Sequence, residues 1–274
     1  MKLFQKNGVL FYRSELLPCP HGFATRVGGI STNAHTKSLN LAFGRGDENE
    51  TVLRNLERFA EAVGISSEAV VSLPQIHGND VLHVSASDRG EGYFKSSNRA
   101  ADGYVTTDPA AALGIKTADC VPILLCGLSE EGSPIAVSAL HAGWRGTVSK
   151  IAEKGIEALV SLGVQKKNIR AAIGPAIGAC CYEVGADFYE AFVSAFGEPF
   201  LDGTFRRKTT EGKYTADLKE INRRILRSAG IPEASIDVCT ECTCCSPELF
   251  FSHRYSHGVR GTMLSVISLP NGAS

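Results

Sequence analysis

The sequence lacks the features that would direct the protein to a membrane or to nucleic acid. It contains no run of roughly 18 apolar residues, the length that a membrane-spanning helix requires. Its 274 residues carry a formal net charge of −1, so no overall positive field would attract nucleic acid or an anionic membrane. The N-terminal residues contain no apolar segment followed by a small-residue cleavage site, and we therefore expect a cytoplasmic protein.

Several common catalytic signatures are missing as well. The chain has no G-x-x-x-x-G-K-[ST] loop for nucleoside triphosphates, no G-x-G-x-x-G turn for dinucleotides and no G-x-S-x-G nucleophile elbow. It has no H-E-x-x-H pair, and neither His77 nor His141 begins the H-x-E sequence of the zinc deaminases. With 7 His, 2 Met and no H-x-H pair, it is poor in the ligands of a multi-copper oxidase. An enzyme with this sequence needs a less common active site.

Disulfide bonds are not expected either, although the chain has 9 Cys. An odd number of cysteines in a long chain without an export signal predicts reduced thiols. The string CTECTCC at 239–245 contains a C-x-x-C pair, Cys239 and Cys242, but no second pair at a distance suited to structural zinc. We interpret the string as oxidation-sensitive surface thiols, with a metal site as the alternative. The vicinal Cys180 and Cys181 are predicted to be packed or to line the active site.

What the sequence does contain is a pattern of many short strands and few helices. Helical spacing of apolar residues predicts helices over 50–63, 148–162, 185–196 and 217–229, with Thr147 and Asp217 as N-caps. Apolar or alternating runs predict strands over 69–73, 80–84, 104–107, 113–117, 121–126, 135–140, 169–174, 236–239 and 263–269. Strands that follow one another without an intervening helix predict the α/β (α+β) class. We expect a single domain, 1–274, of layered mixed β-sheets with flanking helices. The polar stretches 85–103 and 197–214 are predicted excursions from it.

Polar residues of types that are common in active sites lie at the ends of three of these predicted strands. His77 follows one strand, Asp119 and Cys120 lie between two, and His141 ends another. Two imidazoles and one thiolate are a known ligand set for zinc, and three protein ligands leave a fourth position for water or substrate. The same residues also suit a nucleophilic pair in which His141 activates the Cys120 thiol. A structural interpretation, with His77 in a turn and Cys120 as a buried thiol, fits the spacing equally well.

Arginine residues accompany several glycine turns. Arg26 precedes the pair Gly28 and Gly29, whose amides can point at an anion. Arg145 precedes the predicted 148–162 helix, whose N-terminus would favour a negative group. Arg254 and Arg260 flank a further glycine-containing turn. These positions favour phosphate binding over the alternative, in which the arginines are ordinary surface residues.

Several short strings of the sequence, taken together, indicate a protein family more specifically than any one of them does alone. TRVGGIS, SLNL, QIHG, AADG, TADCVPILL, LHAGWRGT, IGPAIGACCYEV and FFSHR occur in this order over nearly the whole chain. The sequence resembles in this respect the laccase-domain family, which is also called polyphenol-oxidase-like or peptidoglycan editing factor. Some members of that family are described as multifunctional purine nucleoside enzymes.

The resemblance implies a single domain similar in outline to the cysteine-hydrolase-like folds, with His77, Cys120 and His141 as zinc ligands. It also implies phosphorolysis of adenosine, inosine and methylthioadenosine, and deamination of adenosine. Nucleosides and phosphate are then the partners, and we expect a monomer or weak homodimer. Our assignment of site residues is Cys120, His141 and Asp119 as catalytic, and Arg26, Asn40 (within SLNL), Arg145 and Arg260 as substrate- and phosphate-binding.

The sequence is also compatible with other activities. A Cys–His amidase would use Cys120 and His141 on peptidoglycan precursors. A copper-dependent polyphenol oxidase, or laccase, would hold copper at the three proposed zinc ligands, although the chain is too poor in histidine for a full set of copper centres. A non-enzymatic zinc-binding module would bind metal without turning over any substrate.

Overall fold

Two six-stranded sheets packed face to face form the centre of the protein. The computed structural model describes residues 1–270. The first sheet has the strand order β1–β2–β3–β15–β7–β4 and the second β14–β10–β8–β9–β6–β5. The strands of the first sheet are β1 (Lys2–Lys6), β2 (Val9–Arg13), β3 (His21–Ala24), β4 (Val70–Val71), β7 (Ala112–Thr117) and β15 (Met263–Ser268). Those of the second are β5 (Val81–His83), β6 (Gly103–Thr106), β8 (Val121–Leu128), β9 (Pro134–Ala142), β10 (Ile169–Ile173) and β14 (Ile236–Val238).

Both sheets are mixed, as the sequence predicts. Most neighbouring strands are antiparallel, whereas β4 pairs with β7, β5 with β6 and β14 with β10 in parallel. Strand β8 is buried along its whole length. Leu124 of this strand packs toward the first sheet, and Leu125 packs toward the helices on the other side. Burial on both faces explains why VPILLCGL is apolar without alternation.

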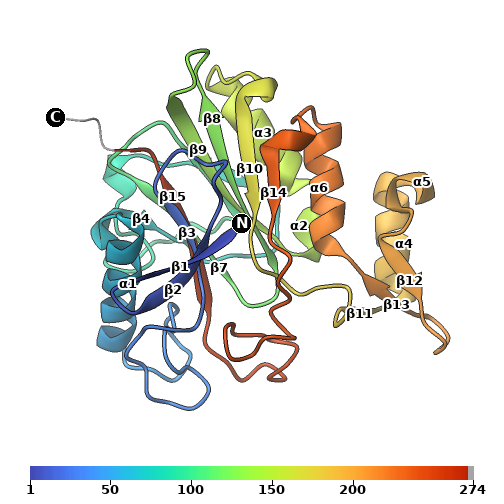
Figure 1. Cartoon of the computed structure of the whole chain (residues 1–274), viewed down its shortest axis with the longest axis horizontal. Coiled ribbons are helices and arrows are strands. Elements are labelled where there is room, and N and C mark those ends of the chain that lie inside the picture. Colours follow the sequence, from blue (N-terminus) through green and yellow to red (C-terminus); the bar gives the residue numbers. More distant parts are fainter. Residues whose placement is uncertain (271–274) are drawn as a thin grey trace.

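Helices cover the outer faces of this sandwich. Helix α1 (Asn49–Val63) packs on the first sheet through an apolar stripe that includes Leu56 and Phe59. Helices α3 (Ile151–Ser161) and α6 (Leu218–Ser228) cover the second sheet on the opposite side, as Figure 1 shows. The single domain therefore has helix, sheet, sheet and helix layers. Short 3-10 helices occupy Ser67–Ala69, Ala86–Asp88, Lys166–Asn168 and Glu233–Ser235. Within the described residues, no helix is both long and apolar enough to span a membrane.

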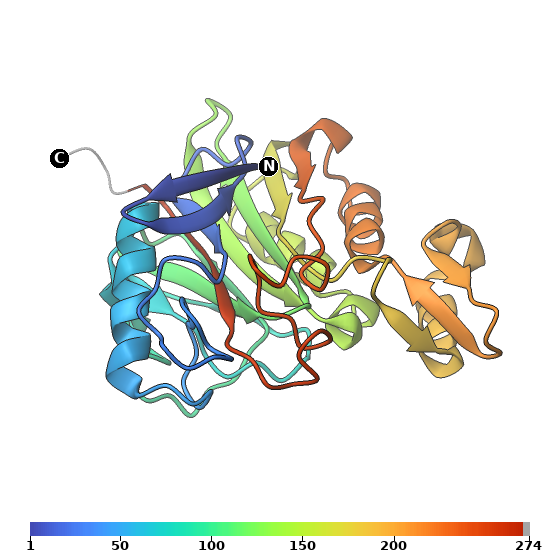
Figure 2. The ribbon, with the colours of Figure 1, turned by 60° about the horizontal axis from the view of Figure 1, so that its bottom comes forward.

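A small lobe projects from one side of the sandwich. It contains a three-stranded sheet of order β11–β13–β12, and helices α4 (Ala186–Phe196) and α5 (Glu198–Leu201). Its strands are β11 (Glu183–Gly185), β12 (Phe205–Arg207) and β13 (Lys213–Ala216). Figure 2 shows the lobe beside the main body. The stretch 197–214, predicted as a polar excursion, does leave the sandwich as part of this lobe. The sequence did not predict its short elements, which an aromatic cluster of Tyr189, Phe205 and Tyr214 stabilises.

Two predicted helix starts can be compared directly with the structure. The predicted 148–162 helix is split into α2 (Trp144–Val148) and α3, and Lys150 between them has a left-handed φ of 63°. Thr147 does not cap α3, because it lies inside α2 and the N-cap position of α3 is Lys150; its hydroxyl accepts a hydrogen bond from Asn222 of α6. Asp217 is the N-cap of α6, as predicted, and accepts a bond from the Glu220 amide.

Candidate functional site

Three side chains that are distant in the sequence meet at one end of the sandwich. Cys120 lies in the turn between β7 and β8, and His141 lies near the end of β9, opposite Pro122 of β8. His77 comes from the loop between β4 and β5. One ligand atom from each of the three lies within 4.8 Å of the others, and the two imidazole rings meet edge to face. The predicted clustering of these strand-end residues is therefore present in the fold.

A fourth residue, Asp102, organises this cluster and was missed by the sequence analysis. Its carboxylate is fully buried and accepts a 2.7 Å hydrogen bond from Nδ1 of His141. It also accepts bonds from the backbone amides of Ile76, His77 and Gly78. One carboxylate thus fixes both the His141 ring and the loop that carries His77. The available signal was the AADG string, in which an aspartate directly precedes a buried strand.

These contacts set the charge of the site. Burial raises the pKa of Asp102, but hydrogen bonds from His141 and from the Gly78 amide bring the net pKa below its usual value. Burial lowers the pKa of His141, yet its interactions with Asp102 and Cys120 outweigh this and raise it to about 9. The pKa of His77 is lowered by burial and by the nearby His141. His141 is therefore the more basic of the two imidazoles.

Gly143 leaves the space in which the three side chains approach one another. A Cβ atom at this position would lie 2.8 Å from Nδ1 of His77, 3.4 Å from Cε1 of His141 and 3.5 Å from Sγ of Cys120. The shortest of these distances is too close for any real Cβ contact. The glycine of the LHAGWRG stretch is therefore required by the cluster and not only by the turn.

The residues of the cluster fit a metal ion. Two imidazoles and a thiol provide three donors. His141 donates through Nδ1 to a buried carboxylate, so its Nε2 lone pair is directed away from Asp102. This carboxylate–histidine arrangement is typical of metal-ligating histidines. We therefore describe the cluster of His77, Cys120 and His141 as the candidate metal site.

Two cavities meet at the candidate metal site. The first, of about 300 Å³, has an apolar and aromatic wall formed by Trp144, Ile177, Tyr182 and Leu218. The second, of about 230 Å³, is polar and basic, with Arg45, Lys116 and Gln75 in its wall. Four residues belong to both cavities: His77, Ala118, Cys120 and Arg260. The site is thus bordered by an aromatic compartment on one side and a basic compartment on the other.

The predicted anion-binding residues do not all lie at this site. Arg260 lines both cavities. Arg145 stacks its guanidinium 4.4 Å from the ring centre of Trp144 and is solvent-exposed. It lies within the first turn of the short helix α2 and not at the N-terminus of α3, which begins at Ile151.

Arg26 and Asn40 have structural positions instead. The Arg26 guanidinium donates to the carbonyls of Lys37 and Pro247, and lies over the Phe251 ring. Asn40 is fully buried, and its amide group bonds to backbone atoms and to the carboxylate of Asp47. Neither residue lines the two cavities at the candidate metal site. The amides of the glycine turn after Arg26, which the sequence analysis assigns to an anion, donate to the Ser38 hydroxyl within the protein.

Asp119 lies in the wall of the aromatic cavity, but its carboxylate is already occupied. One oxygen accepts a 2.6 Å bond from the Thr243 hydroxyl, and the other accepts a 2.7 Å bond from the Arg254 amide. Asp119 also has a left-handed φ of 94°, a conformation that a non-glycine residue adopts only when its surroundings enforce it. These contacts hold the turn that presents Cys120.

The fold and the site together define a class of protein: a layered α/β domain with a His₂Cys candidate metal site at the ends of its central strands. Residues 20–270 match the family described as multi-copper polyphenol oxidoreductase laccase, and the chain belongs to this family. It is 36% identical to a purine nucleoside phosphorylase of Deinococcus radiodurans, over 96% of this chain and 94% of that protein. It is 33% identical to adenosine deaminase RL5 of an unknown prokaryotic organism, over 85% and 87% of the two chains.

A solved structure shows the same architecture. The YfiH protein of Bacillus licheniformis superposes with a TM-score of 0.87 at 32% identity, covering 98% of this chain and 99% of that one. The predicted fold class and the family resemblance are both confirmed by these comparisons.

Proposed function

We propose that the protein is a purine nucleoside enzyme that cleaves nucleosides with phosphate at the candidate metal site. The observation that carries this proposal is the pair of unlike cavities that share the site. A nucleoside carries an aromatic base, whereas phosphate is an anion, and the two substrates react at the ribose of the nucleoside. The names of the relatives from Deinococcus radiodurans and of RL5 support the same class of substrate.

The aromatic cavity suits the purine base. Trp144 and Tyr182 offer ring faces for stacking, and Ile177 and Leu218 exclude water from the base. The exposed guanidinium of Arg145 is stacked on Trp144, where it stiffens that ring and adds positive charge at the entrance. We propose this supporting role for Arg145 in substrate binding.

The basic cavity suits phosphate. Within residues 1–270, Arg45, Lys116 and Arg260 form no ion pair with a carboxylate. Burial lowers the pKa of Lys116 to about 8, and Nε of Arg260 is buried without a hydrogen-bond partner in the described part of the chain. Nζ of Lys116 donates one bond in the protein, to the Ser72 carbonyl at 3.1 Å, and a bound anion would give both cationic groups a charged partner.

The reaction then follows from this placement. A phosphate oxygen held by the basic cavity forms a bond to the anomeric carbon of the ribose, and the bond between that carbon and the purine nitrogen breaks. The base leaves with the electron pair and takes up the proton that the attacking hydrogen phosphate loses, so the products are free base and ribose 1-phosphate. The positive groups of the basic cavity orient the nucleophile, while the aromatic wall holds the leaving base.

Deamination of adenosine is the second reaction that we propose. Zinc held by His77, Cys120 and His141 would supply a water molecule of lowered pKa. Asp102 keeps the His141 ring in place and holds its Nδ1 proton. We propose that Asp119 positions Cys120 and does not transfer protons, because both of its carboxylate oxygens accept bonds from Thr243 and Arg254. Zinc is preferred over copper because the chain has only 7 His and no H-x-H pair.

The direct test is incubation of the purified protein with adenosine and phosphate, followed by chromatography. We expect adenine and ribose 1-phosphate, which depend on phosphate, and inosine, which does not. Cys120→Ser should remove both activities. Absence of all three products from the wild-type protein, in its zinc-loaded form, would contradict the proposal and favour a non-enzymatic metal-binding module.

One observation favours a second candidate, the Cys–His amidase. Cys120, His141 and Asp102 form a thiol, imidazole and carboxylate series, the arrangement that activates a cysteine nucleophile. Release of an amino acid from a muramyl peptide, abolished in Cys120→Ser and retained after removal of metal by a chelator, would support the amidase instead.

A further inference from the structure

We propose a second metal site, at which Cys180, Cys181, Cys242 and Cys245 bind one Zn²⁺ ion through four thiolates. The sulfur atoms of these four residues all lie within 4.8 Å of one another. They come from two loops, one between β10 and β11 and the other after β14. We call these four residues the cysteine quartet. The relatives' names and the candidate metal site give no role to them.

The sulfur separations match a single tetrahedral ion. Sγ of Cys245 lies 3.4 Å from Sγ of Cys180 and 3.3 Å from Sγ of Cys181. Zn–S bonds of about 2.3 Å in tetrahedral geometry place sulfurs about 3.8 Å apart, so a small expansion of the quartet accommodates the ion. The observed separations are well above the roughly 2.05 Å of a disulfide bond. Four cysteines form one of the standard ligand sets of structural zinc.

The backbone around the quartet is arranged for a thiolate. The Gly178 amide donates a 3.1 Å hydrogen bond to Sγ of Cys242, and such bonds stabilise negative charge on sulfur. A Cβ at Gly178 would lie 3.2 Å from Sγ of Cys180 and 3.2 Å from Cβ of Cys242, tighter than most real contacts. A glycine at this position therefore permits the close approach of the two cysteine loops.

The two loops are already joined by backbone contacts. Ala176 and Cys242 form a parallel bridge, and the Thr243 amide donates to the Ala176 carbonyl at 3.1 Å. The ligand atoms are thus preorganised by the fold and do not depend on one flexible segment. Cys180 and Cys245 are exposed at the surface, which gives the ion a path of entry.

The sequence points to the wrong pair of cysteines in this region. It suggests Cys239 and Cys242 as the C-x-x-C pair, whereas Cys239 is buried elsewhere and its carbonyl accepts a bond from Lys219. The pair in the structure is Cys242 and Cys245. The missing second pair is supplied by Cys180 and Cys181, about 60 residues earlier in the chain.

The quartet is connected to the wall of the aromatic cavity. Thr243, between two of the ligands, donates its hydroxyl hydrogen to Asp119, the neighbour of Cys120. The Cys181 carbonyl accepts a bond from the Arg254 guanidinium, which lines the same cavity. An ion in the quartet would therefore fix the loops that hold this wall, and its role is structural.

The test is metal analysis of the full-length protein, purified under reducing conditions. We expect two zinc ions per chain in the wild type, one in Cys245→Ser and one in His141→Ala. Cys244→Ser is the matched control, since Cys244 neighbours the quartet in sequence but is not one of its members, and it should keep two. A Cys245→Ser protein that keeps all of the zinc found in the wild type would overturn the proposal, as would a His141→Ala protein that binds none.

Cobalt substitution provides a readout that does not depend on a cysteine variant that folds. In His141→Ala loaded with Co²⁺, we expect the strong thiolate-to-cobalt charge-transfer absorption of a four-sulfur tetrahedral site. The candidate metal site has only one thiol and cannot give this spectrum. A Co²⁺-loaded His141→Ala protein without that absorption contradicts the proposal. So does a disulfide from Cys245 to Cys180 or Cys181 that persists in reductant.

Discussion

At position 143, the absence of a side chain determines whether three candidate ligands can approach one another. A methyl group there would meet His77 at 2.8 Å and would also touch the His141 ring and the Cys120 sulfur. The preceding residues of β9 set the direction of His141, while the loop before β5 brings His77 to the same point. The geometry of the candidate metal site therefore depends most strictly on a single residue, Gly143.

We expect Gly143→Ala to weaken zinc binding by roughly tenfold or more, because one ligand must move away from the added methyl group. Competition with a chromophoric chelator measures this affinity. Gly78→Ala is the matched control, because a Cβ at Gly78 meets only ordinary contacts at 3.6 Å and beyond. Equal affinities of the two variants would show that Gly143 is not needed for the ligand geometry.

Asp102→Asn should lower metal affinity by roughly 10- to 100-fold, the range found for loss of a carboxylate that orients a ligating histidine. An amide oxygen can still accept some of the bonds from the 76–78 loop, but the amide NH₂ cannot accept the others. Calorimetric titration with zinc measures the loss. Unchanged affinity would contradict the organising role of this carboxylate.

His21 predicts a pH dependence of stability that is separate from the candidate metal site. The ring is fully buried; Nε2 accepts a bond from the Ser14 amide and Nδ1 lies 2.8 Å from the Cys19 carbonyl. Burial lowers the His21 pKa from 6.5 to about 4. The unfolded chain therefore binds a proton more readily than the folded one in this window. The stabilisation is complete above pH 6.5 and is lost as the pH falls toward 4, by about 3 kcal/mol.

Urea unfolding of the metal-free protein at several pH values between 7 and 4 measures this effect. Compared with the wild type, His21→Gln should be less stable at pH 7 and should show a smaller loss of stability on acidification. Parallel pH curves for the two proteins would contradict the prediction.

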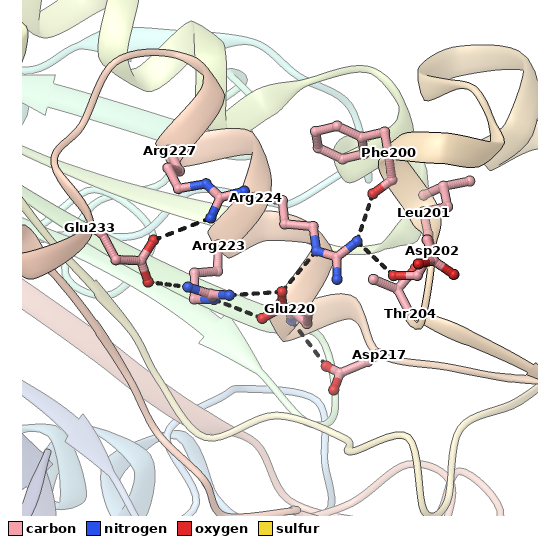
Figure 3. A network of polar contacts seen from close by, with 10 residues as sticks. All are labelled: Phe200, Leu201, Asp202, Thr204, Asp217, Glu220, Arg223, Arg224, Arg227 and Glu233. Carbon is pink, nitrogen blue, oxygen red and sulfur yellow. Dashed lines mark hydrogen bonds and ion pairs between the residues drawn. The ribbon is translucent and has the colours of Figure 1, made fainter.

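At the scale of elements, helix α6 joins the small lobe to the sandwich. Figure 3 shows the polar network on this helix: Glu220 pairs with Arg223 and Arg224, and Arg223 reaches Glu233. Arg224 also donates at 2.8 Å to the carbonyls of Phe200 and Asp202 in and after α5. The first residue of the same helix, Leu218, lines the aromatic cavity. Helix α6 thus both attaches the lobe to the sandwich and forms part of the wall of the aromatic cavity.

Arg224→Ala should release the α5 region, because two carbonyls lose their charged donor. We expect a loss of about 1–3 kcal/mol in the free energy of unfolding and faster hydrogen exchange in residues 198–204. Arg227→Ala is the control: its contact with Glu233 is 3.9 Å long and exposed, and it should change stability by less than about 1 kcal/mol. Equal exchange rates in the two variants would exclude this anchoring role.

At the scale of the whole molecule, the face-to-face sheets create one end at which the two cavities meet. Because the cavities differ in chemistry, the proposed nucleoside reaction predicts separable effects on its two substrates. Arg45→Ala should raise KM for phosphate several-fold with little change in KM for the nucleoside. Trp144→Ala should do the reverse.

Steady-state kinetics with each substrate varied in turn measures this separation. Arg206→Ala, which removes an exposed arginine of β12 in the small lobe, is the control and should behave like the wild type. A uniform fall in kcat for both cavity variants, with both KM values unchanged, would contradict the assignment of one substrate to each cavity.

The sequence by itself determined the family, the mixed sheet class and most strands and helices, because these depend on local periodicity and on short strings. It also indicated His77, Cys120 and His141, since each is a ligand-type residue at the end of an apolar run. It did not reveal the N-terminal strands β1–β3, of which the exposed β1 has no apolar face to bury.

Only the tertiary structure decided what surrounds these residues. The bond of Asp102 to His141, the basic cavity of Arg45 and Lys116, and the cysteine quartet all join residues far apart in the chain. The structural positions of Arg26 and Asn40 depend in the same way on distant carbonyl and carboxylate partners. Sequence spacing describes which side chains share a strand or helix face. Contacts between separate strands and loops depend on how the sheets pack, and no local pattern in a single sequence specifies them.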